Sequence, residues 1–199
     1  MNRAFQFLSY EVRGLHVAVY ILAFSALLSS LLALVRDRLM AHAFGASATL
    51  DLYYAAFRIP DLIFVAMGAL VSVYVLIPEL TKRLPEDQRA YIDTILVGFS
   101  ALAAAVSVVA AITAPFFLAL LFPQLNTADG ELVLLTRIML LQPFFLGLSN
   151  ILAAITQVRA RYALYALSPH LYNLGIIAGV LFLYPLWGTA GLADGVVLG

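Results

Sequence analysis

The chain has 199 residues, of which 64% are hydrophobic and 11% are charged, and its formal net charge at pH 7 is zero. Soluble domains carry roughly half apolar and a quarter charged residues, so this composition excludes a water-soluble domain, a disordered segment and a nucleic-acid binder that relies on bulk positive charge. Cysteine is absent, which excludes a disulfide framework and a thiolate metal site. We therefore predict an all-α, polytopic transmembrane bundle of about six helices, at roughly 20 residues per crossing.

The charged residues divide the chain into a polar start and six apolar segments. The start, residues 1–14, carries Arg3, Glu11 and Arg13 and lacks the cleavage site of a removable signal peptide. The last apolar segment is too short to cross a bilayer, so we expect it to be the beginning of a truncated helix in a longer protein. The predicted helices cover residues 15–35, 50–80, 91–122, 132–158, 162–186 and 188–199.

Prolines are predicted to break three of these segments. Pro60, Pro143 and Pro169 each lie inside an apolar run, where proline removes a backbone donor. Discontinuous helices line the substrate cavities of many transporters, so the segments with these prolines are candidates for a cavity wall. The most hydrophilic stretch, residues 82–89, is predicted to be a solvent loop.

The distribution of lysine and arginine predicts the orientation of the bundle. Cytoplasmic loops of membrane proteins carry an excess of these residues. The opposite loops offer only Arg36 and Arg38. We therefore expect a cytoplasmic N-terminus in a multi-pass membrane protein. The basic residues on the side predicted to be cytoplasmic are Arg3, Arg13, Lys82, Arg83, Arg89, Arg159 and Arg161.

Charged residues inside the apolar segments are the first candidates for function. Arg58 and Asp61 are three residues apart and share one helix face. Burying either charge alone in hydrocarbon costs at least ~2.5–3.5 kcal/mol. They therefore either face a water-filled cavity that holds an anionic substrate or neutralise each other near the membrane surface. Arg137 has the same two interpretations, because Asp129 and Glu131 lie close enough in sequence to pair with it.

Arg36, Asp37 and Arg38 follow the predicted end of the first helix, on the outer side. One explanation for the two arginines is that their positive charges interact favourably with the negative C-terminal end of the helix dipole. They also run against the tendency of basic residues to be cytoplasmic. Because the arginine fork binds phosphate in a bidentate manner, an outer phosphate contact is the second explanation.

Motifs of enzyme chemistry are missing from the sequence. His16, His42 and His170 lie in different segments, without a carboxylate at metal-ligand spacing. Ser168 has no nucleophile-elbow glycines around it, and the chain has no phosphate-binding glycine loop with a lysine. We therefore expect a protein that is not an enzyme and that has no cofactor and no metal site.

Two blocks of the sequence resemble a known family. Residues 34–46, together with Asp51 and residues 56–61, are similar to the opening of the MurJ/MviN lipid II flippases, which belong to the multidrug/oligosaccharidyl-lipid/polysaccharide exporter superfamily. The later helices of that family are similar to residues 135–139, 161–173 and 191–199.

The resemblance implies that residues 15–199 are the N-terminal lobe of a two-lobe transporter. Such a protein moves a lipid II-like precursor, linked to undecaprenyl pyrophosphate, across the bacterial cytoplasmic (inner) membrane by alternating access. The implied partners are this anionic lipid-linked substrate, membrane lipids and the missing C-terminal lobe of the same chain, with no nucleic acid. The family's motif assigns substrate contacts to Arg36, Asp37, Asp51 and Ser29, and Arg58 and Arg137 remain as further phosphate candidates.

The sequence departs from the family pattern at two places. Ser30 stands where the family has a cavity arginine, and residues 64–69 replace two arginines and an acid. Three alternatives therefore stay open: a flippase for another polyprenyl-linked glycan, an ion-coupled exporter of amphipathic cations, and a non-transporting membrane scaffold. The exporter would need acidic rather than arginine residues in the cavity; only Asp61 is embedded in a span, and we expect Asp93 and Asp194 near the membrane surfaces, which argues against it.

Overall fold

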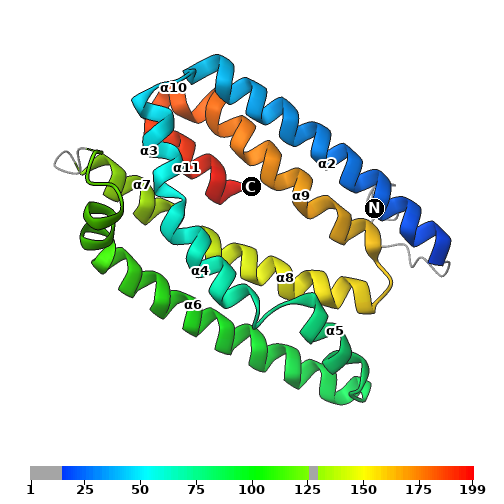
Figure 1. The fold of residues 1–199 in the computed structure, drawn as a ribbon. Helices are drawn as coiled ribbons and strands as arrows, with labels where there is room; N and C mark the ends of the chain where they lie inside the picture. Colours follow the sequence, from blue (N-terminus) through cyan, green and yellow to red (C-terminus); the bar gives the residue numbers. More distant parts are fainter. Residues whose placement is uncertain (1–14, 126–129) are drawn as a thin grey trace.

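The structure is a computed structural model that describes residues 15–125 and 130–199, and these form helices joined by short turns, without a strand (Figure 1). The prediction of an all-α fold is confirmed. The predicted polar start, residues 1–14, lies outside the described residues. Five helical segments in the described part are long and apolar enough to cross a membrane: His16–Phe44, Ala48–Thr81, Pro85–Leu121, Glu131–Val158 and Tyr162–Trp187.

The first helix, α2, covers Leu15–Phe44, so its predicted end at residue 35 is corrected. The helix continues through the charged residues because leucine, methionine and alanine follow them, and these are strong helix formers. It ends before Gly45, whose φ of 56° is left-handed and whose N–H donates to the carbonyl of Ala41 at 2.9 Å. A left-handed glycine of this kind is a common helix stop.

The second span is interrupted twice. The first break, at Phe57, has a clear cause: Pro60 cannot donate to the carbonyl four residues earlier. The second break, residues 69–72, was not predicted, and it ends where the Ser72 hydroxyl caps the next helix by accepting from Tyr74 N–H at 3.3 Å. The three helices of this span are α3, Ala48–Ala56, α4, Arg58–Gly68, and α5, Val73–Thr81.

The third span is one long helix, α6, Pro85–Leu121. It begins six residues before the predicted start at 91, so part of the predicted loop is corrected to helix. Proline at the first helical position and the acids Glu86 and Asp87 in the first turn suit a helix N-terminus, because proline needs no partner there and the acids favour the dipole. The helix runs through Pro115 without a break.

The fourth span breaks at Leu140 and Leu141, and Pro143 is the second residue of the helix that follows. Serine from α6 satisfies part of the freed backbone, since the Ser107 hydroxyl donates to the carbonyl of Leu140 at 3.0 Å. The two parts of the span are α7, Glu131–Met139, and α8, Gln142–Val158.

The fifth span does not break where it was predicted to break. Helix α9, Tyr162–Ala178, continues through Pro169. The irregularity comes one helical turn after Ile176, where Gly179–Leu183 forms a wider π-helical turn (η2) that leads into α10, Tyr184–Trp187. The last helix, α11, Thr189–Leu198, has ten residues, about 15 Å of length, and so is too short to cross a bilayer.

Two apolar cores hold the bundle together. In Figure 1, α2 runs beside α9 on one side, and α4, α5, α6 and α8 lie together on the other. The first core joins the C-terminal part of α2 to α3, the end of α6, α7, α9 and α11, and it contains Met40, Leu118, Leu132, Leu135 and Leu192. The second core joins α4, α5, α6 and α8 and contains Ile63, Leu76, Phe99 and Ile151.

Candidate functional site

A cavity of ≈ 450 Å³ lies among α2, α3, α4 and α9. Its lining combines four charged side chains with aromatic and apolar ones, an unusual mixture for helices of this hydropathy. The break at Phe57 places the first turn of α4 at the cavity. The charged lining residues are Arg36, Asp37, Arg58 and Asp61, and the others are Met40, Tyr53, Tyr54, Phe57, Tyr172 and Ile176.

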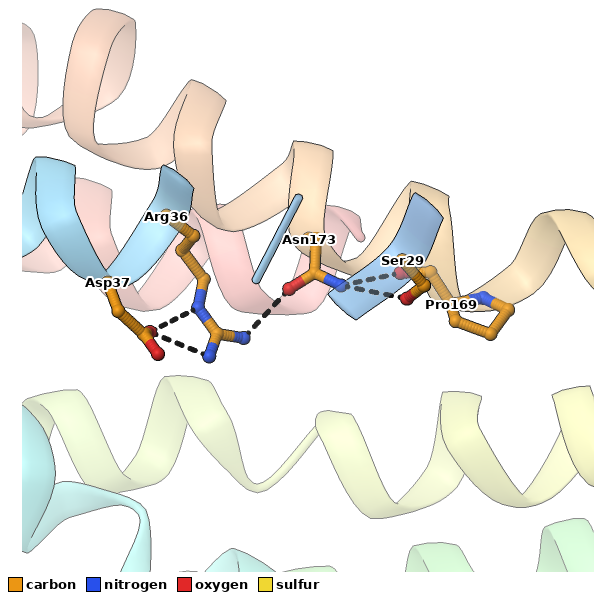
Figure 2. Close-up of polar contacts among 5 residues, drawn as sticks. All are labelled: Ser29, Arg36, Asp37, Pro169 and Asn173. Carbon is orange, nitrogen blue, oxygen red and sulfur yellow. Dashed lines mark hydrogen bonds and ion pairs between the residues drawn. The ribbon is translucent and has the colours of Figure 1, made fainter. Parts of the chain in front are cut away.

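Arg36 is held by two neighbours (Figure 2). Its Nε and Nη2 donate to Oδ1 of Asp37 at 2.9 and 2.8 Å, and its Nη1 donates to Oδ1 of Asn173 at 2.9 Å. The Arg36 side chain is 23% exposed, against 60% for Asp37. Because a guanidinium has five N–H donors, the bonds within the described residues leave two of them for a ligand in the cavity.

Arg36 and Asp37 lie inside α2, not at its end. The helix continues for more than two turns beyond Arg36, whereas the helix dipole acts within the last turn. The explanation of these charges by the dipole is therefore wrong. A place on the cavity wall accounts for them instead.

Asn173 fixes the position of the Arg36 side chain from the neighbouring helix. It is 5% exposed, and its amide nitrogen donates to the Pro169 carbonyl at 2.9 Å and to the Ser29 hydroxyl at 3.4 Å (Figure 2). With both N–H groups used in this way, the amide oxygen faces Arg36. Ser29 therefore supports the cavity through Asn173, and it does not line the cavity itself.

Arg58 and Asp61 come from the first turn of α4 and line the same cavity. The i, i+3 spacing places them on one face, as expected. No ion pair joins them within residues 15–125 and 130–199. The structure thus brings together three residues predicted as contacts, Arg36, Asp37 and Arg58, with Asp61, which the sequence placed on the same helix face as Arg58.

Aromatic residues form much of the remaining wall. Tyr53 packs edge-to-face on Phe57, with ring centroids 5.0 Å apart. From α8, the Gln142 amide nitrogen donates to the Tyr172 hydroxyl at 3.4 Å. Tyr53, Tyr172 and Asn173 are site residues that were not predicted from the sequence. A signal existed for Asn173, because an asparagine in an apolar span usually bonds to another helix.

Two residues predicted as contacts lie elsewhere. Asp51 is exposed in the first turn of α3, where a negative charge interacts favourably with the positive end of the helix dipole. Arg137 is exposed on α7, and its Nε donates to the Ala111 carbonyl at 3.1 Å. The expected partner Glu131 instead accepts a hydrogen bond from the Thr189 hydroxyl at 2.6 Å. Asp129 lies outside the described residues.

In the described part of the chain, no three His, Asp or Glu side chains lie close enough together to hold a metal ion. The cavity offers guanidinium N–H groups and tyrosine hydroxyls as hydrogen-bond donors, and carboxylates as acceptors. Such groups bind a polar or anionic group, with phosphate the best geometric match for the arginine fork.

Five apolar spans and a charged cavity between them define a multi-pass helical membrane protein. The sequence model of the family described as "Lipid II flippase MurJ" matches residues 40–199. The chain is 31% identical to a lipid II flippase MurJ of Burkholderia cenocepacia, over 80% of this chain and 32% of that protein. It is 31% identical to a probable lipid II flippase MurJ of Thermotoga maritima, over 87% of this chain and 38% of that protein.

The fold agrees with a solved structure titled "Lipid II flippase MurJ, inward closed conformation". The TM-score is 0.73 at 23% sequence identity, over 90% of this chain and 40% of that chain. The chain belongs to the MurJ family, and it spans about a third of the length of the curated relatives that it matches.

Proposed function

We propose that residues 15–199 form the N-terminal lobe of a transporter that moves a lipid II-like precursor, linked to undecaprenyl pyrophosphate, across the cytoplasmic membrane by alternating access. In this proposal the protein is not a catalyst, and its partners are the lipid-linked substrate, membrane lipids and a second lobe of the same chain. Residues 1–14 would be a cytoplasmic segment. The relatives' names support the substrate class.

The observation that carries the proposal is the pair of arginines in one cavity. Arg36 and Arg58 come from two different apolar spans and line the same space. Each would be costly in hydrocarbon without a partner, by ~2.5–3.5 kcal/mol or more on insertion scales. Asp37 and Asn173 hold Arg36, and within the described residues two of its N–H groups have no partner. A pyrophosphate group would be a fitting partner for these donors.

The cavity also bears on the cation-exporter alternative. That function needs carboxylates available to a cation, yet Asp37 already accepts two bonds from Arg36. Asp61 is the second acid of the cavity, and it shares the lining with Arg58. The balance of available groups favours an anionic ligand. The glycan on the lipid would contact the missing lobe as well as this one. A flippase for another polyprenyl-linked glycan therefore remains a second candidate function.

The fold is consistent with a cytoplasmic N-terminus. In Figure 1 the start of α2, the α5–α6 turn and the α8–α9 turn lie toward the same end of the bundle. Lys82, Arg83, Arg159 and Arg161 belong to these turns. By the positive-inside rule this end would face the cytoplasm, and the cavity residues Arg36 and Arg58 would then lie nearer the outer side.

Complementation of a bacterial strain depleted of its lipid II flippase tests the proposal. The full-length protein is expected to rescue growth, and Arg36→Ala is expected to abolish the rescue while the protein still inserts in the membrane. Arg38→Ala is the matched control, because Arg38 is exposed two residues away and does not line the cavity. Equal rescue by both variants would contradict the proposed role of the cavity.

A further inference from the structure

An apolar groove of ≈ 460 Å³ runs between α4 and α6, next to the charged cavity. Its walls are aliphatic and aromatic, apart from one threonine and one arginine. Several wall residues are strongly exposed in the isolated bundle, with Leu62 73% and Val109 60% exposed. The residues that matter below are Arg58, Leu62, Ile63, Val109, Phe117 and Leu121.

The groove and the cavity meet at Arg58, which lines both. A third hollow, lined by Arg58, Asp61, Leu62 and Leu121, lies at the same junction. The charged cavity is therefore continuous with the apolar groove along the surface of the protein. A ligand that fits both parts must have a polar, anionic end and an apolar chain.

The length of the groove indicates which kind of lipid chain it can bind. Its lining on α6 extends from Ala105 to Leu121, which is about 24 Å at 1.5 Å per residue. One leaflet of the hydrocarbon core is about 15 Å deep, half of the total. The groove is thus longer than the space that an ordinary acyl chain occupies in its leaflet, and a longer chain can use all of it.

We propose that the α4/α6 groove binds the polyprenyl chain of the carried lipid while Arg58 binds the phosphate at the chain's polar end. This inference rests on the proposed function and adds the place of the lipid tail on this lobe. Charge complementarity at Arg58 and the continuity of the groove with the headgroup cavity support an anionic lipid, and the length of the groove supports a polyprenyl chain over the shorter chains of a membrane phospholipid. Binding would cover the exposed faces of Leu62 and Val109 and exclude other lipid from them.

Site-specific photo-crosslinking tests the groove. The full-length protein carries p-benzoylphenylalanine in place of Val109 or, as matched control, in place of Val108. These neighbours on α6 are 60% and 58% exposed, so both tolerate the probe, but Val109 lines the groove and Val108 does not. The protein is reconstituted in phosphatidylglycerol vesicles that contain undecaprenyl phosphate, and the crosslinked lipids are identified by mass spectrometry.

We expect the probe at Val109 to capture undecaprenyl phosphate at least about tenfold more than the probe at Val108. Arg58→Gln is expected to reduce the capture at Val109 by roughly tenfold, because a charge-assisted hydrogen bond to the phosphate is lost. Equal capture at the two positions would overturn the proposal, and so would capture of phosphatidylglycerol in place of the polyprenyl lipid. Arg36→Ala separates the two claims: it tests transport through the headgroup cavity, whereas the difference between positions 109 and 108 tests the groove alone.

Discussion

Replacing Asn173 by alanine removes the amide oxygen that holds Arg36 in the cavity. The lost bond is 2.9 Å long and has a charged donor, a type worth ~1.5–3 kcal/mol. Because the Arg36 side chain is 23% exposed, water in the cavity can replace part of the bond, so we expect the lower end, about 1.5 kcal/mol. This energy corresponds to roughly tenfold weaker binding of a pyrophosphate lipid.

The assay is equilibrium binding of undecaprenyl pyrophosphate to the purified full-length protein, followed by native mass spectrometry. Ser168→Ala is the control on the same helix: its hydroxyl bonds to Ser149 at 3.0 Å, and neither residue lines the cavity. We expect this control to bind the lipid like the wild type. Binding by Asn173→Ala within twofold of the wild type would refute the positioning of Arg36 by Asn173.

Two further predictions concern the packing of α11. A Cβ atom at Gly195 would lie 2.5 Å from the Cα of Gly179, so Gly195→Ala is expected to destabilise the fold by about 1–3 kcal/mol, seen as a lower melting temperature in detergent. Gly98→Ala, with nothing within 4 Å of the added atom, is the control and should not lower it. Thr189→Val removes the 2.6 Å bond to Glu131 and should cost about 1–2 kcal/mol by the same measurement; an unchanged melting temperature would show that α11 does not depend on this bond.

The spans could be predicted from the sequence because their signal is local. Long apolar runs separated by charges show where the chain crosses the bilayer, and five such spans are present in the described residues. The exact positions of helix ends and helix breaks depend on smaller differences in free energy. The charges at residues 36–38 predict a helix end at residue 35, yet the helix formers after them extend α2 to Phe44. Pro169 was expected to break a helix that continues through it, while the break at residues 69–72 has no proline.

The cavity could be predicted only in part, because it is assembled from distant segments. Intramembrane charge indicated Arg58 and Asp61, since charges in apolar spans are expensive and usually functional. Arg36 was indicated by its predicted position on the outer side, and Asp37 by the family resemblance. The partner Asn173 is 137 residues from Arg36 along the chain, and spacing cannot show that α9 packs beside α2. For the same reason, Asp51 and Arg137 were grouped with the site although neither lines the cavity.

Reconstituted translocation tests the central claim most directly. The full-length protein is placed in liposomes with a fluorescent lipid II in the inner leaflet, and a membrane-impermeant reagent measures how fast the headgroup becomes accessible outside. We predict rapid exposure with the wild type and with Arg38→Ala, and no exposure above protein-free liposomes with Arg36→Ala. Exposure by Arg36→Ala at the wild-type rate would contradict the claim that this cavity carries the headgroup.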